Sequence, residues 1–209
     1  MKFERILCFG DSITLGCYDS RGLGWPGRLY LGRKRGERHV AVYNLGINGD
    51  TSSDIAARWR REAEARSRDE PGLLMFAFGF NDAARANGGE PQVDLSHSVA
   101  NAREILGTAR MLYRVLWIGP TPLDESVNPL RTDYASWDMR NDEIARYDDA
   151  YARLAAEIEV DYLSLFADFL QSPRYRAALD AGDRVHPGDD GYAMIAERIK
   201  NWHAWQIHL

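Results

Sequence analysis

The chain has 209 residues, of which 45% are hydrophobic and 11% aromatic, so it can build a sizeable core and is neither disordered nor fibrous. Its formal net charge of -5 at pH 7 excludes an overall positive charge that would attract nucleic acid, so we expect no nucleic-acid partner. The two cysteines, Cys8 and Cys17, give no disulfide framework and no metal-ligand spacing, so reduced, buried thiols are expected. The N-terminal segment has the pattern of neither a signal peptide nor a membrane span, which favours a cytoplasmic protein.

Short, nearly continuous apolar runs bounded by Gly, Pro, Asn or Asp predict five β-strands. In chain order these strands lie near Arg5–Phe9, Val40–Leu45, Leu73–Phe78, Val115–Ile118 and Tyr162–Phe166. Runs of this kind are typical of a parallel sheet that is buried on both faces.

Helical patterns lie between these strands. One helix is predicted to open at Pro26, and the others cover Asp54–Arg66, Val99–Tyr113, Glu143–Glu159 and Tyr192–Gln206. The order of strand then helix, repeated five times, predicts a three-layer α/β/α fold with right-handed crossovers. We expect one domain over residues 1–209.

The segment Gly119–Asp142 contains three prolines and is longer than most connections in a compact domain. This length predicts a binding loop or a lid. A surface excursion without function is the alternative.

Polar motifs follow the predicted strands at their carboxyl ends, where open α/β sheets bind their ligands. "GDS" (Gly10–Ser12) follows the first strand, "NLGINGDTS" (Asn44–Ser52) the second and "GFND" (Gly79–Asp82) the third. "DRVHP" (Asp183–Pro187) follows the fifth strand. One serine, one histidine and one aspartate can therefore converge at this edge of the sheet.

Acyl transfer needs a nucleophile, a base, a carboxylate that holds the imidazole tautomer and N–H donors for the oxyanion. Ser12 is the candidate nucleophile and His186 the candidate base. Asp183 lies three residues earlier on the same loop and can orient His186. Gly49 and Asn81 are the candidate oxyanion donors.

Together the four segments resemble the consensus blocks of the GDSL esterase/lipase family, also called the SGNH hydrolases. The resemblance implies a flavodoxin-like five-stranded sheet and a serine esterase that cleaves a small-molecule ester, with a short acyl chain, through an acyl-enzyme. It implies no metal and no other cofactor. The family's triad and oxyanion-hole residues fall here on five positions, which are Ser12, Gly49, Asn81, Asp183 and His186. Gly49 is preferred to Gly46 because "NGDTS" matches the end of the family's second block, and Ile13 stands where the family has leucine.

Three alternatives stay open beside this interpretation. Ser12 taken alone could be a helix cap, although the four blocks together favour the nucleophile. Among enzymes, a carbohydrate O-acetyl esterase is the second candidate because Trp137 and Tyr134 could face a sugar, and acyl transfer to an alcohol is a third. Outside enzymes, the chain could be a catalytically inactive ligand-binding module.

Several other motifs are predicted to have no catalytic role. "GLGWPG" (Gly22–Gly27) fits a dinucleotide fingerprint but does not follow a strand directly, and Pro26 occupies its loop. The basic cluster Arg33–His39 is expected to be a solvated helix end. Asp82 is expected to be structural. The remaining histidines lack the combination of a preceding aspartate at three residues and a following proline, and they are His39, His97, His203 and His208.

The last predicted helix carries two tryptophans at helical spacing from two isoleucines. Trp202 and Trp205, with Ile195 and Ile199, predict a stripe that packs into the core. A contact between subunits of a homo-oligomer is the alternative for this stripe.

Overall fold

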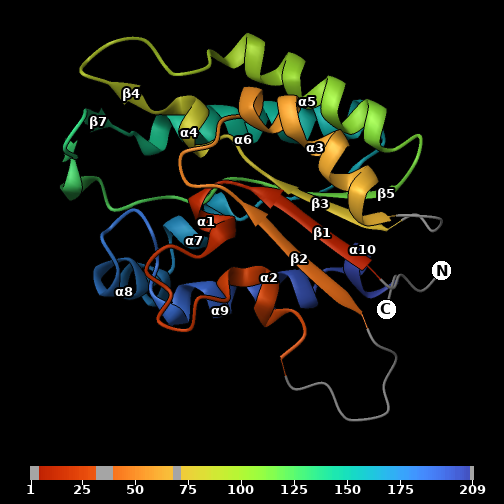
Figure 1. Cartoon of the computed structure of the whole chain (residues 1–209). Helices are drawn as coiled ribbons and strands as arrows, with labels where there is room; N and C mark the ends of the chain where they lie inside the picture. Colours follow the sequence, from red (N-terminus) through yellow and green to blue (C-terminus); the bar gives the residue numbers. More distant parts are fainter. Residues whose placement is uncertain (1–4, 32–39, 68–71, 208–209) are drawn as a thin grey trace.

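The computed structural model describes residues 5–31, 40–67 and 72–207. In this part of the chain, five parallel strands form the central sheet in the order β2-β1-β3-β5-β8, with helices on both of its faces (Figure 1). The strands are Arg5–Gly10 (β1), Ala41–Gly46 (β2), Leu73–Ala77 (β3), Arg114–Ile118 (β5) and Asp161–Leu163 (β8). Counted along the chain, this is the order 2-1-3-4-5 of flavodoxin-like sheets, so the predicted three-layer fold is confirmed.

The sheet separates two hydrophobic cores because successive side chains of its central strands point to opposite faces. Along β1, Leu7 and Phe9 belong to one core, and Ile6 and Cys8 belong to the other. The helices that pack on the first core are α3 (Ser52–Ser67), α5 (Leu95–Ala109) and α6 (Asn141–Glu157). The helices that pack on the second core are α2 (Gly24–Arg28), α7 (Phe166–Leu170), α8 (Pro173–Ala181), α9 (Asp189–Lys200) and α10 (His203–Gln206).

The prediction of one continuous helix over Tyr192–Gln206 is wrong, because the structure has two helices there. α9 ends at Lys200, and Trp202 takes an extended backbone before α10 begins at His203. This break turns the chain so that Trp205 is buried and packs edge-on against Tyr30. Ile195, Ile199 and Trp205 do lie in the core as predicted, whereas Trp202 is half-buried beside it.

The helix predicted at Pro26 begins two residues earlier, at Gly24. Its start is held by Asp19, whose carboxylate accepts hydrogen bonds from the backbone N–H groups of Leu23 (2.9 Å) and Gly24 (2.8 Å). The same carboxylate binds the Arg28 guanidinium, with an Nη2–Oδ1 distance of 2.8 Å. The "GLGWPG" motif therefore spans a loop and a short helix and does not join a strand to a helix.

The helices α7 and α8 were not predicted, and the fifth strand is shorter than expected because it ends at Leu163. Both helices are short and are held by tertiary packing, including the stacked rings of Phe169 and Tyr175. A local signal for α8 was present, since Ser172 caps it and Pro173 occupies its first turn.

The Gly119–Asp142 segment is not irregular throughout. It contains two short strands, β6 (Leu130–Arg131) and β7 (Ser136–Asp138). Together with β4 (Arg85–Ala86) they form an antiparallel sheet in the order β4-β7-β6 within the described residues. Strands of two or three residues carry no apolar run, so the periodicity of the sequence could not show them.

The predictions for the basic cluster Arg33–His39 and for His208 concern residues outside the described part of the chain. Among the residues that are described, no helix combines the length and apolar character needed to cross a membrane.

Candidate active site

The parallel register of the three central strands brings the predicted motifs to one edge of the sheet. Gly10, the last residue of β1, pairs with Gly46 on β2 and with Ala77 on β3. The segments that follow these residues carry Ser12, Gly49 and Asn81. They lie side by side because parallel strands end at the same edge.

Ser12 is the first residue of the short helix α1 (Ser12–Leu15), and it is not the cap of that helix. Asp11 is the cap, since its side chain accepts a hydrogen bond of 2.9 Å from the backbone N–H of Ile13. The Ser12 hydroxyl is instead 2.8 Å from Nε2 of His186. The structure therefore leaves the Ser12 side chain free of the capping role and pairs it with an imidazole.

His186 is oriented by Asp183. Its Nδ1 lies 2.9 Å from Asp183 Oδ2, so Nδ1–H can donate to the carboxylate while Nε2 accepts from Ser12. The backbone N–H of His186 also donates to Asp183 Oδ1, at 2.7 Å. Burial works to raise the pKa of Asp183, but the hydrogen bond and the charge of His186 hold that pKa below its usual value. The carboxylate is therefore ionised and can stabilise an imidazolium.

Further contacts, beside the one between His186 and Asp183, join the region around His186 to the segment that follows α1. Ser20 donates from its backbone N–H and its hydroxyl to Asp189 at the start of α9, at 2.8 and 2.5 Å. The Tyr192 hydroxyl donates to the carbonyl of Cys17 at 2.6 Å. These bonds set the spacing between the Ser12 and His186 segments.

Gly49 and Gly46 have different structural roles. Gly49 has a φ of 83°, in the left-handed region that favours glycine, and a Cβ there would meet nothing within 4 Å. Gly46 packs closely on α1, where a Cβ would lie 2.2 Å from the backbone nitrogen of Leu15. Gly49 lines the open cleft beside Ser12, and Gly46 is not among the residues that line it.

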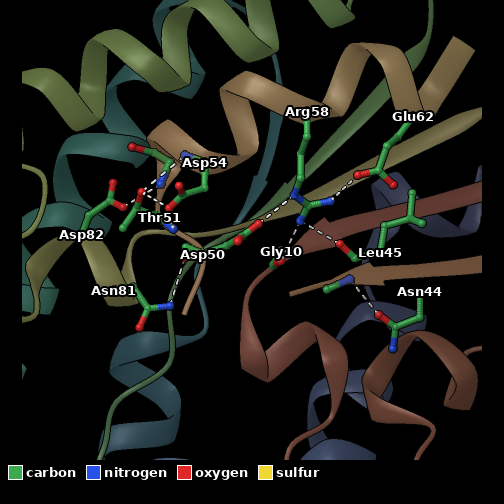
Figure 2. A network of polar contacts seen from close by, with 12 residues as sticks. Gly10, Asn44, Leu45, Asp50, Thr51, Asp54, Arg58, Glu62, Asn81 and Asp82 are labelled. Carbon is green, nitrogen blue, oxygen red and sulfur yellow. Dashed lines mark hydrogen bonds and ion pairs between the residues drawn. The ribbon is translucent and has the colours of Figure 1, made fainter. Parts of the chain in front are cut away.

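Asn81 lies in α4 (Phe80–Ala83), the short helix that follows β3. Its Nδ2 donates to the backbone carbonyl of Asp50 at 2.9 Å, which fixes the side-chain amide beside Gly49 (Figure 2). The neighbouring Asp82 does not line the cleft. It is buried and accepts hydrogen bonds from Ser52 N–H (2.7 Å) and the Ser98 hydroxyl (2.5 Å), as expected for a structural residue.

All five predicted site residues line one cleft with a volume of about 650 Å³. One wall comes from the segment Gly119–Asp142, so its prediction as a binding loop is supported by its position. The residues that this segment contributes are Leu130, Arg131, Thr132, Tyr134, Trp137 and Met139. Aromatic and polar side chains thus face the candidate nucleophile across the cleft.

Three features of the site were not predicted. The prediction of buried thiols is wrong for Cys17, which is only half-buried because it follows the left-handed turn at Gly16 that ends α1 and lines the cleft. Tyr18 lies parallel to the His186 ring, with 5.8 Å between ring centroids and 16° between planes. Burial raises the pKa of Asp11 to about 6, against the opposing effects of the Ile13 N–H and of His186.

A second D-x-x-H sequence shows why this motif alone is weak. Asp94 and His97 are also within hydrogen-bond distance of each other, with 2.5 Å between Oδ2 and Nδ1, at the start of α5. The His97 side chain is 79% exposed and does not line the Ser12 cleft. His203 is likewise exposed, at the start of α10. His186 is distinguished by its place beside Ser12 and not by the spacing. Its motif does not follow the fifth strand directly as predicted, because α7 and α8 lie between β8 and Asp183.

Hydrolases that activate a hydroxyl typically carry a serine, an imidazole and a carboxylate in series. Here these three groups lie above the carboxyl ends of a flavodoxin-like sheet. The sequence matches the GDSL-like lipase/acylhydrolase family over residues 8–194, and the chain belongs to that family of hydrolases acting on ester bonds.

Two curated relatives are esterases. An acetylxylan esterase of Geobacillus stearothermophilus is 29% identical, covering 92% of this chain and 90% of that protein. An isoamyl acetate-hydrolyzing esterase of Saccharomyces cerevisiae is 26% identical, covering 95% of this chain and 85% of that protein.

Solved structures share the fold at lower identity. A lipase/acylhydrolase from Enterococcus faecalis has a TM-score of 0.72 at 22% identity, over 96% of this chain and 94% of that one. A catalytic mutant of the Geobacillus acetylxylan esterase has a TM-score of 0.72 at 21% identity, over 97% and 96%.

Proposed function

We propose that this esterase hydrolyses short-chain carboxylic esters, and acetyl esters above all, through an acyl-enzyme on Ser12. The observation that carries the proposal is the continuous hydrogen-bonded series from Ser12 Oγ to His186 Nε2 (2.8 Å) and from His186 Nδ1 to Asp183 Oδ2 (2.9 Å). Such a series is what a neutral hydroxyl needs to become a nucleophile.

In the proposed reaction, His186 takes the Ser12 proton as Oγ attacks the carbonyl carbon, and then protonates the departing alcohol. The tetrahedral oxyanion accepts hydrogen bonds from the backbone N–H groups of Ser12 and Gly49 and from the Asn81 amide. Ser12 N–H is suited to this role because first-turn N–H groups have no partner within their helix. Water then repeats the cycle on the acyl-enzyme and releases the acid.

The names of both curated relatives refer to acetate esters, which supports acetyl as the acyl group. The cleft supports a carbohydrate acetate as the favoured substrate, because its wall combines the rings of Trp137 and Tyr134 with polar groups such as Arg131 and Gln92. The acetate of an aliphatic alcohol is the second candidate, through the likeness to the Saccharomyces esterase.

A fluorophosphonate probe tests the nucleophile. We expect covalent labelling of the wild type and none of Ser12→Ala, whereas absence of labelling in both would favour a ligand-binding module. p-Nitrophenyl esters of graded acyl length then test the acyl preference, and we expect acetate to give the highest kcat/KM. Acetylated xylo-oligosaccharides compared with isoamyl acetate separate the two alcohols.

A further inference from the structure

Arg58, on α3, reaches the strand ends from behind the candidate oxyanion hole. Its side chain is only 16% exposed, and its guanidinium lies beside the Phe9 ring, 5.8 Å from the ring centroid. Figure 2 shows the guanidinium between Gly10 and Leu45 at the ends of β1 and β2 and Asp50 in the loop that follows β2. A buried positive charge in this position requires acceptors on several sides.

The guanidinium has four hydrogen-bond acceptors. Nε donates to Asp50 Oδ2 at 2.7 Å, and Nη1 donates to Glu62 Oε1 at 2.9 Å. Nη2 donates to two backbone carbonyls, those of Leu45 (2.8 Å) and Gly10 (3.2 Å). One planar group thus joins the end of β1, the end of β2 and the following loop.

Two of these contacts, those to Gly10 and Asp50, lead to candidate site residues. The Gly10 carbonyl lies two residues before Ser12 and also accepts the Ile47 N–H at 3.0 Å. Asp50 follows Gly49 directly, and its carbonyl is the acceptor that fixes the Asn81 amide, at 2.9 Å. The path from Arg58 to Asn81 therefore has one intermediate residue, Asp50.

We propose that Arg58 is a positioning residue that holds the Asn81 amide, one of the candidate oxyanion donors, in place by binding Asp50 and the ends of β1 and β2. This inference rests on the function proposed above for Ser12, Gly49 and Asn81. Preorganised donors stabilise a developing oxyanion without having to reorient, so a loop left loose at Asp50 slows the chemical step. Arg58 itself touches neither substrate nor the reacting atoms.

Lysine cannot replace Arg58 in this arrangement. An ammonium offers three donors from a single atom, whereas the four acceptors lie around a planar fork with donors on three nitrogens. The other end of the loop is fixed independently, because Asp82 accepts the Ser52 N–H. Loss of Arg58 should therefore loosen the Gly49–Asp50 part of the loop while α3 stays attached.

The test is a double-mutant cycle between Arg58 and Asn81, with rates normalised to the fluorophosphonate-labelled fraction. We expect Arg58→Met and Arg58→Lys to lower kcat about ten- to a hundredfold with KM changed by less than about threefold. In the Asn81→Ala background, Arg58→Met should lower kcat by less than about threefold, because both changes act on the same donor. Should Arg58→Met fail to fold, Asp50→Asn enters the same cycle and interrupts the same path.

Arg66→Met is the matched control, since Arg66 lies on the same helix and also pairs with Glu62 but does not contact Gly10, Leu45 or Asp50. Its kcat should equal that of the wild type. Multiplicative effects in the cycle, or a normal kcat in Arg58→Met while Ser12→Ala is inactive, would overturn the inference alone. Full activity in Ser12→Ala would instead overturn the proposed function.

Discussion

Asn81 is the residue at which a chemical role and a structural role can be separated most directly. Its amide donates to the Asp50 carbonyl and lines the cleft beside Ser12. We expect Asn81→Ala to lower kcat by about a hundredfold to a thousandfold with little change in KM, as for the loss of one oxyanion donor. The lost hydrogen bond should cost about 1 kcal/mol in the free energy of unfolding. Steady-state kinetics and urea unfolding of this variant give both values, and a near-normal kcat would remove Asn81 from the site.

Tyr18 combines an unusual backbone with an exposed ring beside the candidate active site. Its φ of 62° lies in the left-handed region, its side chain is 62% exposed, and its ring lies parallel to that of His186. Replacing Tyr18 by Gly or Ala removes the ring in both variants, but only Gly relieves the backbone. We expect the free energy of unfolding of Tyr18→Gly to exceed that of Tyr18→Ala by about 1 kcal/mol. KM should rise above the wild-type value equally in both variants, because both lose the ring. Equal melting temperatures would contradict the backbone part of this prediction.

At the scale of elements, the small sheet β4-β7-β6 provides the wall of the cleft that faces the candidate nucleophile. The turn between β6 and β7 closes through the hydrogen bond from Thr132 N–H to the Ala135 carbonyl, at 2.9 Å. Tyr134 lies in this turn, lines the cleft and is 77% exposed. The turn can therefore contact the part of a substrate that extends away from the ester.

Tyr134→Ala tests this role of the hairpin. Because the side chain is exposed, the free energy of unfolding should change by less than about 0.5 kcal/mol. We expect KM to rise for acetylated oligosaccharides and to stay unchanged for p-nitrophenyl acetate, which is too small to reach the turn. Equal changes for both substrates, measured in parallel, would show that the hairpin does not select for the alcohol.

The elements that could be predicted from the sequence are the long ones with a strong pattern. The strands β1, β2, β3 and β5 carry apolar runs, and each observed bound lies within one residue of the predicted one. The short helices α7 and α8 and the strands of the small sheet were missed because tertiary contacts hold them and no periodic pattern marks them. The break between α9 and α10 was missed because Trp202 continues the helical spacing of the apolar residues.

The residues of the candidate site, like the elements of the fold, could be predicted only where the sequence carries a recognisable pattern. All five predicted site residues belong to recognisable motifs and line one cleft. Ser12, Gly49 and Asn81 follow strand ends, whereas Asp183 and His186 lie between α8 and α9, two helices beyond β8. Arg58 carried no such signal, because α3 has several arginines that resemble a solvated helix face. Its burial depends on Asp50, Leu45 and Gly10, which only the folded sheet places around it.

At the scale of the whole molecule, Asp11 should make the stability of the fold depend on pH. This carboxyl is buried beside the sheet, and burial raises its pKa in the folded state to about 6, whereas an unfolded chain has about 3.9. The folded state therefore keeps a proton that the unfolded state has lost between these two values. The stability contributed by this group is complete below about pH 4 and is lost as pH rises through 6.

Asp11→Asn isolates this contribution, because the amide oxygen can still accept the Ile13 N–H but carries no charge. We expect the free energy of unfolding of Asp11→Asn, relative to the wild type, to rise by up to about 3 kcal/mol between pH 4 and pH 8. Urea unfolding at the two pH values measures the difference. A difference that does not vary with pH would mean that the Asp11 carboxyl has the same pKa in both states.

The contact between Ser12 and His186 joins residues that are 174 positions apart in the chain. In the proposed mechanism the Ser12 hydroxyl is activated only when His186 lies beside it, so a chain shortened before Asp183 would keep the candidate nucleophile and lose its base. Such a fragment would hydrolyse no ester through Ser12 and could not deplete the substrate.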